Sequence, residues 1–222
     1  MNWEPILLTF QLSLITTLLL ILIAIPLAYW LTYTKFRGKI VLEALISMPL
    51  VLPPTVLGFY ILVAFSPNNS VGRFLQENLG LQLAFSFEGL VLASILYSLP
   101  FMVQPIAAGF ASLSPSLKEA AYVLGKSRME TLIWVLLPNI RGAILTGIVL
   151  AFAHTIGEFG VVLMIGGSIP GQTRVASIAI YEEVEALNYG LANSYSLFLF
   201  VVSFCILLVV YGLNRNSPQR VW

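Results

Sequence analysis

The amino-acid sequence predicts an all-α protein, a bundle of membrane-spanning helices forming a single domain over residues 1–222. Of its 222 residues, 59% are hydrophobic and 9% are charged, whereas about a quarter of a typical soluble domain is charged. Four windows of about 30 residues carry no charge, against the roughly 20 that a helix needs to cross the hydrocarbon core; they are 5–34, 44–72, 89–117 and 186–214. A chain so poor in charge cannot cover a soluble surface, so the membrane is the predicted environment.

The first window is predicted to be a retained membrane helix and not a cleaved signal peptide. The residues before it lack the positive charge of a signal peptide, and the apolar run is too long for one. One more span, the fourth in chain order, is predicted over residues 140–165, with Arg141 at one end and His154 and Glu158 toward the other. Backbone groups in lipid must be paired within their own segment, so we expect five transmembrane helices.

The positions of Lys and Arg predict the orientation, because cytoplasmic loops carry an excess of both. Nine of the eleven fall on one side of the predicted spans: Lys35, Arg37, Lys39, Lys118, Lys126, Arg128, Arg141, Arg215 and Arg220. The other two, Arg73 and Arg174, fall on the opposite side. The N-terminus is therefore expected outside and the C-terminus inside, with external loops at 66–87 and 166–185.

Composition excludes several classes of site. A net charge of +1 provides no basic field for nucleic acid. The single cysteine, Cys205, cannot form an internal disulfide and has no metal-ligand spacing. Its apolar setting predicts a small buried core residue. No metal site and no catalytic residue is expected.

Proline predicts breaks inside two spans. Pro49, Pro53 and Pro54 lie within six residues of the second span, where they remove backbone donors and free the carbonyls that those donors would have bonded. The third span holds Ser98-Leu99-Pro100 and Gln104-Pro105. Transporters use broken helices to direct backbone dipoles at a substrate, and the alternative is a kink that serves packing alone. We favour a pathway role, with these candidates: Pro53, Pro54, Thr55, Gly58 and Ser98.

The fourth span has a face of small and ionisable residues. Ala143, Gly147, Ala151, His154 and Glu158 recur at intervals of three or four, so they are expected on one side of a helix. Ionisable groups inside a membrane are functional candidates. Glu158 would lie about 25 Å along the axis from Arg141, near the external surface. A gating role and a structural pairing or cap at the outer end are both open for it.

The most specific pattern is a segment at about 114–126, between the third and fourth spans. Ser114 is a plausible N-cap with Pro115 at the first helical position, and Gly125 is a natural helix stop. Ser127 and Glu130 form a capping-box pattern that opens the next helix. A short helix on the cytoplasmic face is therefore expected, and the residues alone fit equally a simple amphipathic linker and a helix that presents Glu119 and Ala120 to a partner. Its apolar stripe would lie on the protein's own helices: Leu113, Leu117, Ala121 and Leu124.

This segment resembles the EAA motif of the permeases of bacterial ATP-binding-cassette (ABC) importers. The matching residues are Glu119-Ala120-Ala121, then Gly125, then Leu137-Pro138. The resemblance covers nearly the whole chain and implies the type I ABC importer permease fold. In that family the segment is a coupling helix that docks on the ATPase subunit, so the resemblance implies coupling residues at Glu119, Ala120, Ala121 and Gly125.

Within that family, three stretches look most like the molybdate permeases. They are the run 50–58 with its two adjacent prolines, Gly157-Glu158-Phe159-Gly160, and Ile169-Pro170-Gly171-Gln172-Thr173. The sulfate and thiosulfate permeases are similar in the same regions and are the near alternative; tungstate is a further candidate substrate. One departure is His154, which stands where relatives usually have Arg.

The resemblance also implies the partners. They are a second copy of the permease, two ABC subunits, an extracytoplasmic oxyanion-binding protein and the lipid of the bacterial inner membrane. The chain has no phosphate-binding loop of the Gly-x-x-x-x-Gly-Lys-Ser/Thr type, so ATP and Mg are expected on the partner, and this chain is expected to be a pore and no enzyme. An ion-driven carrier is a remote alternative, because it would need buried carboxylates and inverted repeats.

Overall fold

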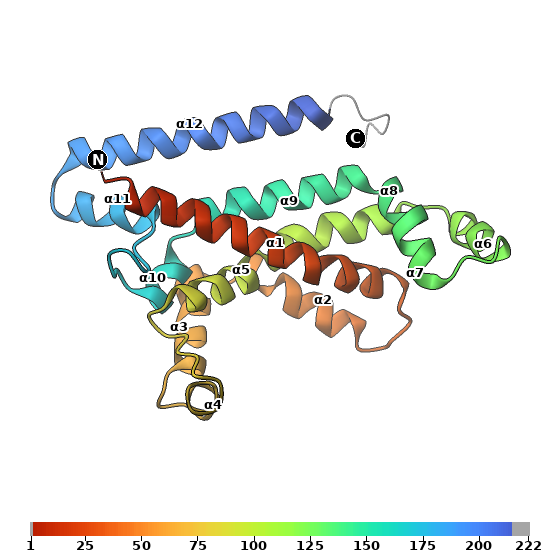
Figure 1. Cartoon of the computed structure of the whole chain (residues 1–222), viewed down its shortest axis with the longest axis horizontal. Helices are drawn as coiled ribbons and strands as arrows, with labels where there is room; N and C mark the ends of the chain where they lie inside the picture. Colours follow the sequence, from red (N-terminus) through yellow and green to blue (C-terminus); the bar gives the residue numbers. More distant parts are fainter. Residues whose placement is uncertain (1, 215–222) are drawn as a thin grey trace.

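The computed structural model describes residues 2–214, the side chains of 209–211 and 213–214 excepted, so Arg215 and Arg220 lie outside the described residues. All of the regular structure in this part of the chain is helical (Figure 1). The helices are α1 (Glu4–Tyr33), α2 (Lys39–Ser47), η1 (Met48–Leu50), α3 (Pro54–Phe65), α4 (Ser70–Leu79), α5 (Phe87–Ala111), α6 (Pro115–Val123), α7 (Arg128–Glu130), η2 (Thr131–Leu136), α8 (Leu137–Asn139), α9 (Arg141–Ile156), α10 (Gly160–Gly166), α11 (Ala176–Glu185) and α12 (Tyr189–Asn214). The predicted all-α fold is confirmed.

Three continuous helices in the described part, α1, α5 and α12, are long and apolar enough to cross a membrane. Two bent pairs also qualify if each is counted as one span, which gives up to five. Residues Lys39–Leu50 and Pro54–Phe65 meet at 112°, and Arg128–Asn139 and Arg141–Ile156 meet at 77°. The span predicted over residues 44–72 therefore contains a sharp bend, whereas the second bend lies at Ile140, at the start of the span predicted over 140–165.

Helix α5 lies at the centre of the bundle, between α1 and α9 (Figure 1). Small residues permit the close approach of α5 and α9: a Cβ added at Gly109 would meet Ala143 Cβ at 2.6 Å, and one at Gly147 would meet Met102 O at 3.1 Å. Helix α10 packs on α3 and α5, and α12 flanks α11. The core lies along the contact of α1 with α5, and includes Leu12 of α1 and Phe110 of α5, both about 1% exposed.

The proline cluster of the second predicted span ends one helix and begins the next, as predicted. Pro49 lies in the 3-10 turn η1, Pro53 has an extended ψ of 135°, and Pro54 is the first residue of α3. The breaks predicted in the third span are wrong, because α5 continues through Pro100 and Pro105. Neighbouring helices and hydroxyl groups can satisfy backbone groups that proline frees, and Pro100 is buried in the centre of the bundle.

The fourth predicted span is shorter than expected. Helix α9 ends at Ile156, and Gly157 is its C-cap, so Glu158 lies in a break before α10. The predicted common helical face therefore holds from Ala143 to His154 and does not reach Glu158. A π-helical turn, η2, precedes the bend into α9.

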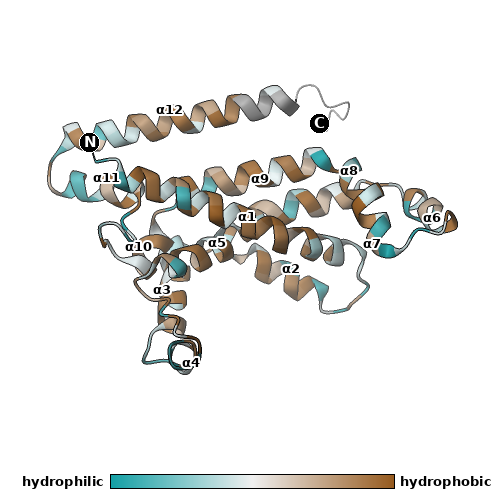
Figure 2. Ribbon diagram, viewed as in Figure 1, coloured by the Kyte–Doolittle hydropathy of each residue, from teal (hydrophilic) through white to brown (hydrophobic). Residues whose placement is uncertain are grey.

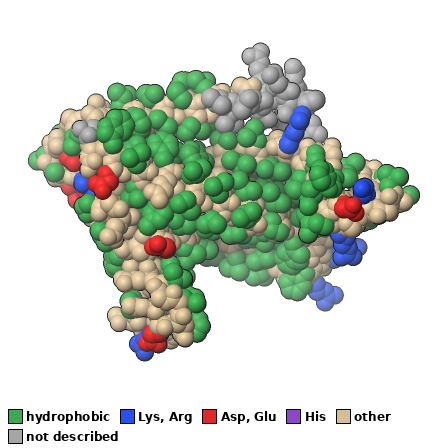
Figure 3. All heavy atoms as spheres, viewed as in Figure 1, with side chains coloured by type: hydrophobic (Ala, Val, Ile, Leu, Met, Phe, Trp, Pro, Cys, Tyr) green, Lys and Arg blue, Asp and Glu red, His purple; other side chains and the backbone are tan. Residues whose placement is uncertain are grey.

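Charge and hydropathy divide the molecule along its length. In Figure 2 the middle of α1, α5, α9 and α12 is hydrophobic, and hydrophilic residues gather at α6 and α7, at α11 and at α4. Most of the visible charged side chains lie toward the ends of the molecule and at α4, with a largely apolar surface between them (Figure 3). This distribution matches a protein whose middle lies in lipid.

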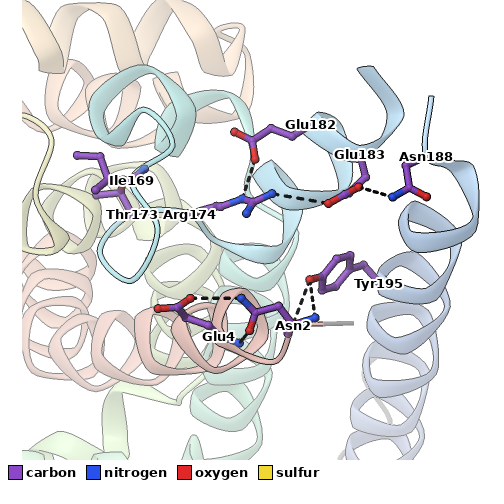
Figure 4. A network of polar contacts seen from close by, with 9 residues as sticks. All are labelled: Asn2, Glu4, Ile169, Thr173, Arg174, Glu182, Glu183, Asn188 and Tyr195. Carbon is purple, nitrogen blue, oxygen red and sulfur yellow. Dashed lines mark hydrogen bonds and ion pairs between the residues drawn. The ribbon is translucent and has the colours of Figure 1, made fainter. Parts of the chain in front are cut away.

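The N-terminus and α12 are held together at the α11 end (Figure 4). The Tyr195 hydroxyl donates to the Asn2 carbonyl at 3.0 Å, and the Asn2 amide donates back to that hydroxyl at 3.1 Å. Arg174 forms two ion pairs with α11. Its Nε lies 2.6 Å from a Glu182 carboxylate oxygen, without the angle of a hydrogen bond, and its Nη2 lies 3.8 Å from a Glu183 carboxylate oxygen.

The prediction that Cys205 is a buried core residue is wrong. Cys205 lies on α12 and is exposed. Only 11% of the most apolar part of α12 is buried, so its apolar sequence covers little core. An apolar run in a membrane protein does not separate a core-facing side chain from a lipid-facing one.

Candidate functional site

Helix α6 occupies the segment for which a short helix was expected. Pro115 is its first residue after Ser114, which has the extended conformation of an N-cap. The chain leaves the helix at Gly125, whose φ is +75°, and the Lys126 amide donates to the Ala121 carbonyl at 3.0 Å. The positive φ explains the glycine, because other residues are strained in that conformation.

Helix α6 has one face packed on the bundle and one exposed face. Ala121 is buried, and Leu113 and Leu117 pack on the main core. Glu119 and Ala120 are exposed, as predicted. Leu124 is 80% exposed, so its place in the predicted apolar stripe is wrong: α6 ends at Val123, and Leu124 no longer follows the helical period.

Together with Leu124, three more apolar side chains are exposed at this tip: Tyr122, Val123 and Met129. The predicted capping box is present behind them. The Ser127 amide donates to a Glu130 carboxylate oxygen at 2.8 Å, and the Glu130 amide donates to Ser127 Oγ at 3.3 Å. The tip is therefore an ordered apolar surface with a fixed turn behind it.

The residues of the second predicted span form a crossing of α3 and α10. A Cβ added at Gly58 would meet Met164 Cβ at 2.8 Å and Val161 Cα at 3.0 Å. A Cβ added at Gly160 would meet Pro54 Cβ at 2.8 Å. Gly58 is buried, Pro53 and Thr55 are exposed, and Pro54 lies between these classes. This crossing fixes the bend of the chain without a polar contact.

His154 and Ser98 form a polar link between α9 and α5. His154 Nδ1 lies 2.9 Å from Ser98 Oγ, and Ser98 Oγ lies 3.1 Å from Thr155 Oγ1. The imidazole is stacked on Phe101, with ring centroids 4.0 Å apart, and tilted against Tyr97 at 4.7 Å. Ser98 is fully buried and His154 is half-buried, so this link lies inside the protomer.

Glu158 is the most deeply buried ionisable residue of this region. It is 4% exposed, although its distance along a helix placed it near the external surface. Helix α11 lies over it, because Ser177 Oγ donates to the Glu158 backbone carbonyl at 2.6 Å. Neither carboxylate oxygen has a partner at full hydrogen-bond geometry in the described structure, and the Ser94 hydroxyl lies close to the carboxyl without reaching that geometry. A structural pairing of this carboxylate is therefore not formed here.

The predicted site residues form three separate groups. Ser98 and His154 are in contact; Pro54, Thr55 and Gly58 lie against α10, with Pro53 next to them in the chain; and the residues from Glu119 to Gly125 lie at the opposite end of the molecule from α10 (Figure 1). Glu158, outside these groups, lies in the break between α9 and α10. Sequence reasoning missed Tyr97 and Phe101, which enclose His154. Their spacing of four residues on one helix was the available signal.

A cavity of about 390 Å³ opens between α1, α2 and α5. Its polar groups are largely paired: the Gln104 amide donates to Ser47 Oγ at 3.1 Å, and Lys39 Nζ lies 3.5 Å from a Glu43 oxygen. None of the predicted pathway residues lines it. No group of three potential metal ligands occurs among the described residues.

Comparison with known proteins adds a family and close relatives. Residues 8–222 match the family described as the binding-protein-dependent transport system inner membrane component. The chain is 44% identical to the molybdenum transport system permease protein ModB of Azotobacter vinelandii, over 94% of this chain and 92% of the relative. It is 34% identical to ModB of Escherichia coli K12, over 99% and 96%. Identity to the sulfate transport system permease protein CysT of Salmonella typhimurium is 30%, over 87% and 70%.

Two solved structures have the same fold. A bacterial ABC transporter involved in the import of the polysaccharide alginate matches 97% of this chain and 79% of its own, with a TM-score of 0.78 at 20% identity. The MetNI methionine ABC transporter, in an inward-facing conformation, matches 97% and 95%, with a TM-score of 0.74 at 13% identity. The architecture is therefore that of type I ABC importer permeases.

Proposed function

This chain belongs to the family of binding-protein-dependent transport system inner membrane components, and from that premise we propose that it is the permease subunit of an ATP-driven molybdate importer. The observation that carries the substrate is the 44% identity to ModB of Azotobacter vinelandii over nearly the whole of both chains. Identity to the sulfate permease is lower and covers 70% of that protein, so sulfate is not favoured. Tungstate, a similar tetrahedral dianion, is expected to follow the same path.

In the proposed complex, ATP is bound and hydrolysed on separate subunits. Two ABC subunits would hold ATP and Mg, and α6 would dock on one of them. The support is the form of the α6 tip: exposed Glu119 and Ala120 beside exposed apolar side chains, all on a helix that Gly125 ends. Exposed apolar patches on a membrane protein's aqueous end are typical of docking sites. We propose that Glu119 and Gly125 carry this docking and that exposed Ala120 permits the close approach, whereas Ala121 is buried and packs α6 on the bundle.

The proposed pathway needs a second copy of the chain. Two copies around a two-fold axis would enclose a path that one bundle of this size does not, and two-fold dimers are the commonest assembly. An extracytoplasmic binding protein would deliver the oxyanion at the α11 end, which corresponds to the predicted external side. The candidates for the pathway are Pro53, Pro54, Thr55 and Gly58 at the bend of the chain. A gating role for Ser98, His154 and Glu158 stays a prediction.

The permease itself is proposed to bind its substrate weakly. The polar groups that a dianion could meet along the proposed pathway are backbone amides, helix N-termini and hydroxyl groups. Selectivity would then lie in the binding protein, because tight binding in the pore would slow release. Submicromolar molybdate affinity of the isolated permease contradicts this part of the proposal.

The test is ATP-driven uptake by the reconstituted complex. The chain is co-purified with the ATPase and the binding protein encoded beside it, and reconstituted in liposomes. Stimulation of ATP hydrolysis and internal accumulation of oxyanion are then measured with molybdate-loaded and sulfate-loaded binding protein. Stimulation by molybdate alone supports the proposal. Stimulation by sulfate alone moves the chain to the sulfate permeases, and failure to form any complex with an ATPase overturns the importer assignment.

A further inference from the structure

Lys118, which directly precedes Glu119 on α6, is enclosed by aromatic rings. Its Nζ lies 4.0 Å from the ring centroid of Tyr33, 5.5 Å from that of Tyr29 and 5.9 Å from that of Tyr122. Tyr29 and Tyr33 are one turn apart at the end of α1, with ring centroids 5.0 Å apart. A lysine within about 6 Å of a ring centroid makes a cation–π contact.

These rings are themselves anchored on the core of the bundle. Phe110 of α5 is 1% exposed and packs edge-on against Tyr29 at 5.6 Å and against Tyr33 at 6.2 Å. The Tyr33 hydroxyl also donates to the Phe110 carbonyl at 3.4 Å. The aromatic group is therefore part of the α1–α5 contact, and Lys118 reaches it from a different helix.

No carboxylate is paired with Lys118 in the described part of the chain. The ion pairs found there use Lys39, Lys126 and Arg174 as the cation. The neighbouring Glu119 is exposed and makes no ion pair with Lys118. The ammonium group is half-buried against tyrosine faces, where its attraction to the rings is stronger than in open water.

Helix α6 has few other attachments to the bundle. Six of its nine residues are exposed, Ala121 is buried, and its packing partner is mainly η2, which follows it in the chain. A helix with so little buried surface can shift relative to the bundle when a force acts on it. The contact of Lys118 with Tyr33 adds a direct attachment to α1, a helix that is distant in the sequence.

We propose that Lys118 is a positioning residue that fixes α6 to the inner end of α1 and α5 through a cation–π contact with Tyr33 and Tyr29. Movement of α6 is then passed to the α1–α5 pair and is not absorbed by the loops that flank α6. This role rests on the proposed function, in which α6 meets the ATPase. The attachment itself is a property of the chain alone and can be measured separately.

The first experiment measures the attachment by amide hydrogen exchange of the full chain in lipid nanodiscs, without partners. Lys118→Met keeps the length and apolar stem of the side chain and removes its charge, whereas Lys118→Arg keeps a cation that stacks on aromatic rings. Amides of 116–124 are expected to exchange roughly two- to thirtyfold faster in Lys118→Met, the range that follows from the usual strength of a cation–π contact. Lys118→Arg is expected to match the unmodified chain.

Lys35→Met is the matched control, since Lys35 is an exposed lysine on the loop after α1 and makes no contact with the aromatic group. It should leave exchange of 116–124 unchanged. Equal exchange in Lys118→Met and the unmodified chain overturns the attachment. An increase of the same size in Lys35→Met also overturns it, because the effect would then follow total charge.

The second experiment measures coupling in the reconstituted complex, as ATP hydrolysed per molybdate imported. Lys118→Met is expected to raise this ratio severalfold, with Lys118→Arg restoring it. Tyr33 is then replaced by Phe and by mono-, di- and trifluorophenylalanine, which weaken the negative face of the ring in steps at almost constant shape. The ratio should rise in that order if the cation–π contact acts, because a purely steric role is indifferent to fluorination.

The outcomes separate the two proposals. If the unmodified complex imports no molybdate with ATP, the proposed function fails, and the hydrogen exchange still decides the attachment. If the complex imports molybdate and its ratio is the same in Lys118→Met and across the fluorinated series, the positioning role of Lys118 is overturned while the importer assignment stands.

Discussion

The imidazole of His154 and the hydroxyl of Ser98 join two central helices of the bundle, with Nδ1 2.9 Å from Oγ. The same hydroxyl lies 3.1 Å from Thr155 Oγ1, whose own proton is directed to the Ala151 carbonyl at 2.9 Å. Buried polar groups depend on such partners, because leaving one unpaired costs its full desolvation. The α5–α9 contact therefore combines close packing at Gly147 with one polar link.

Ser98→Ala is expected to destabilise the protein by about 1–2 kcal/mol, since it leaves His154 Nδ1 without its partner. The control is Ser94→Ala, one turn away on the same face. Ser94 is equally buried, and its hydroxyl faces the Glu158 carboxyl without reaching full hydrogen-bond geometry, so its removal should cost less. Thermal unfolding of both variants in detergent provides the measurement, and equal midpoints would contradict the importance of the His154 link.

Glu158→Gln is expected to keep the thermal midpoint or to raise it by a few degrees. The carboxylate is 4% exposed with no partner for either oxygen, and an uncompensated buried charge is costly. Glutamine keeps the shape of the side chain and removes the charge. Glu158→Ala should lower the midpoint because it leaves a cavity. Equal losses in the two variants would show that the carboxylate is paired in the working protein.

Gly58→Ala is expected to destabilise the α3–α10 crossing by about 1–3 kcal/mol, since the added methyl group meets Met164 Cβ and the Val161 backbone, which cannot move aside cheaply. Gly190→Ala is the control, because a Cβ at this position on α12 meets nothing within 4 Å. That substitution should be neutral or slightly stabilising, since alanine favours a helix over glycine. Similar unfolding curves for both variants would contradict a tight crossing.

Gly125→Ala is expected to raise the ATP hydrolysed per molybdate imported, and the bulkier Gly125→Leu to raise it further, while both chains still insert in the membrane. Gly80→Ala is the matched control for Gly125→Ala. Both glycines have positive φ values, +75° and +64°, with open space around a Cβ, so the backbone strain should be similar, about 1–2 kcal/mol. Only Gly125 lies beside the proposed docking surface. Full coupling in Gly125→Ala, or equal uncoupling in Gly80→Ala, would contradict the assignment.

Much of the fold could be predicted because charge and proline act locally. The absence of charge locates α1, α5 and α12, and the clustered prolines locate the bend between η1 and α3. Pro100 and Pro105 were misleading, since their effect on α5 depends on the helices around them. The end of α9 before Glu158 likewise depends on the packing of α10 and α11, which no local pattern contains.

The candidate site was predictable in the same uneven way. The helix stop at Gly125 and the capping box of Ser127 follow from residue types at fixed spacing. The burial of Glu158 could not be predicted, because distance along a helix axis does not show what covers its end. The contact of Lys118 with Tyr33 joins residues far apart in the sequence, and nothing in either segment indicates the other.

The bend between η1 and α3 has a consequence for how the chain is made. Each half of this pair holds 12 residues or fewer, about 18 Å of helix, so neither half is long enough to cross the bilayer by itself. Helix α10, which packs against α3, is synthesised much later. A nascent chain whose synthesis has just passed α3 therefore holds this bent pair only partly inserted, with unpaired backbone groups. Its biogenesis should depend on an insertase that retains this segment until the second half of the protein arrives.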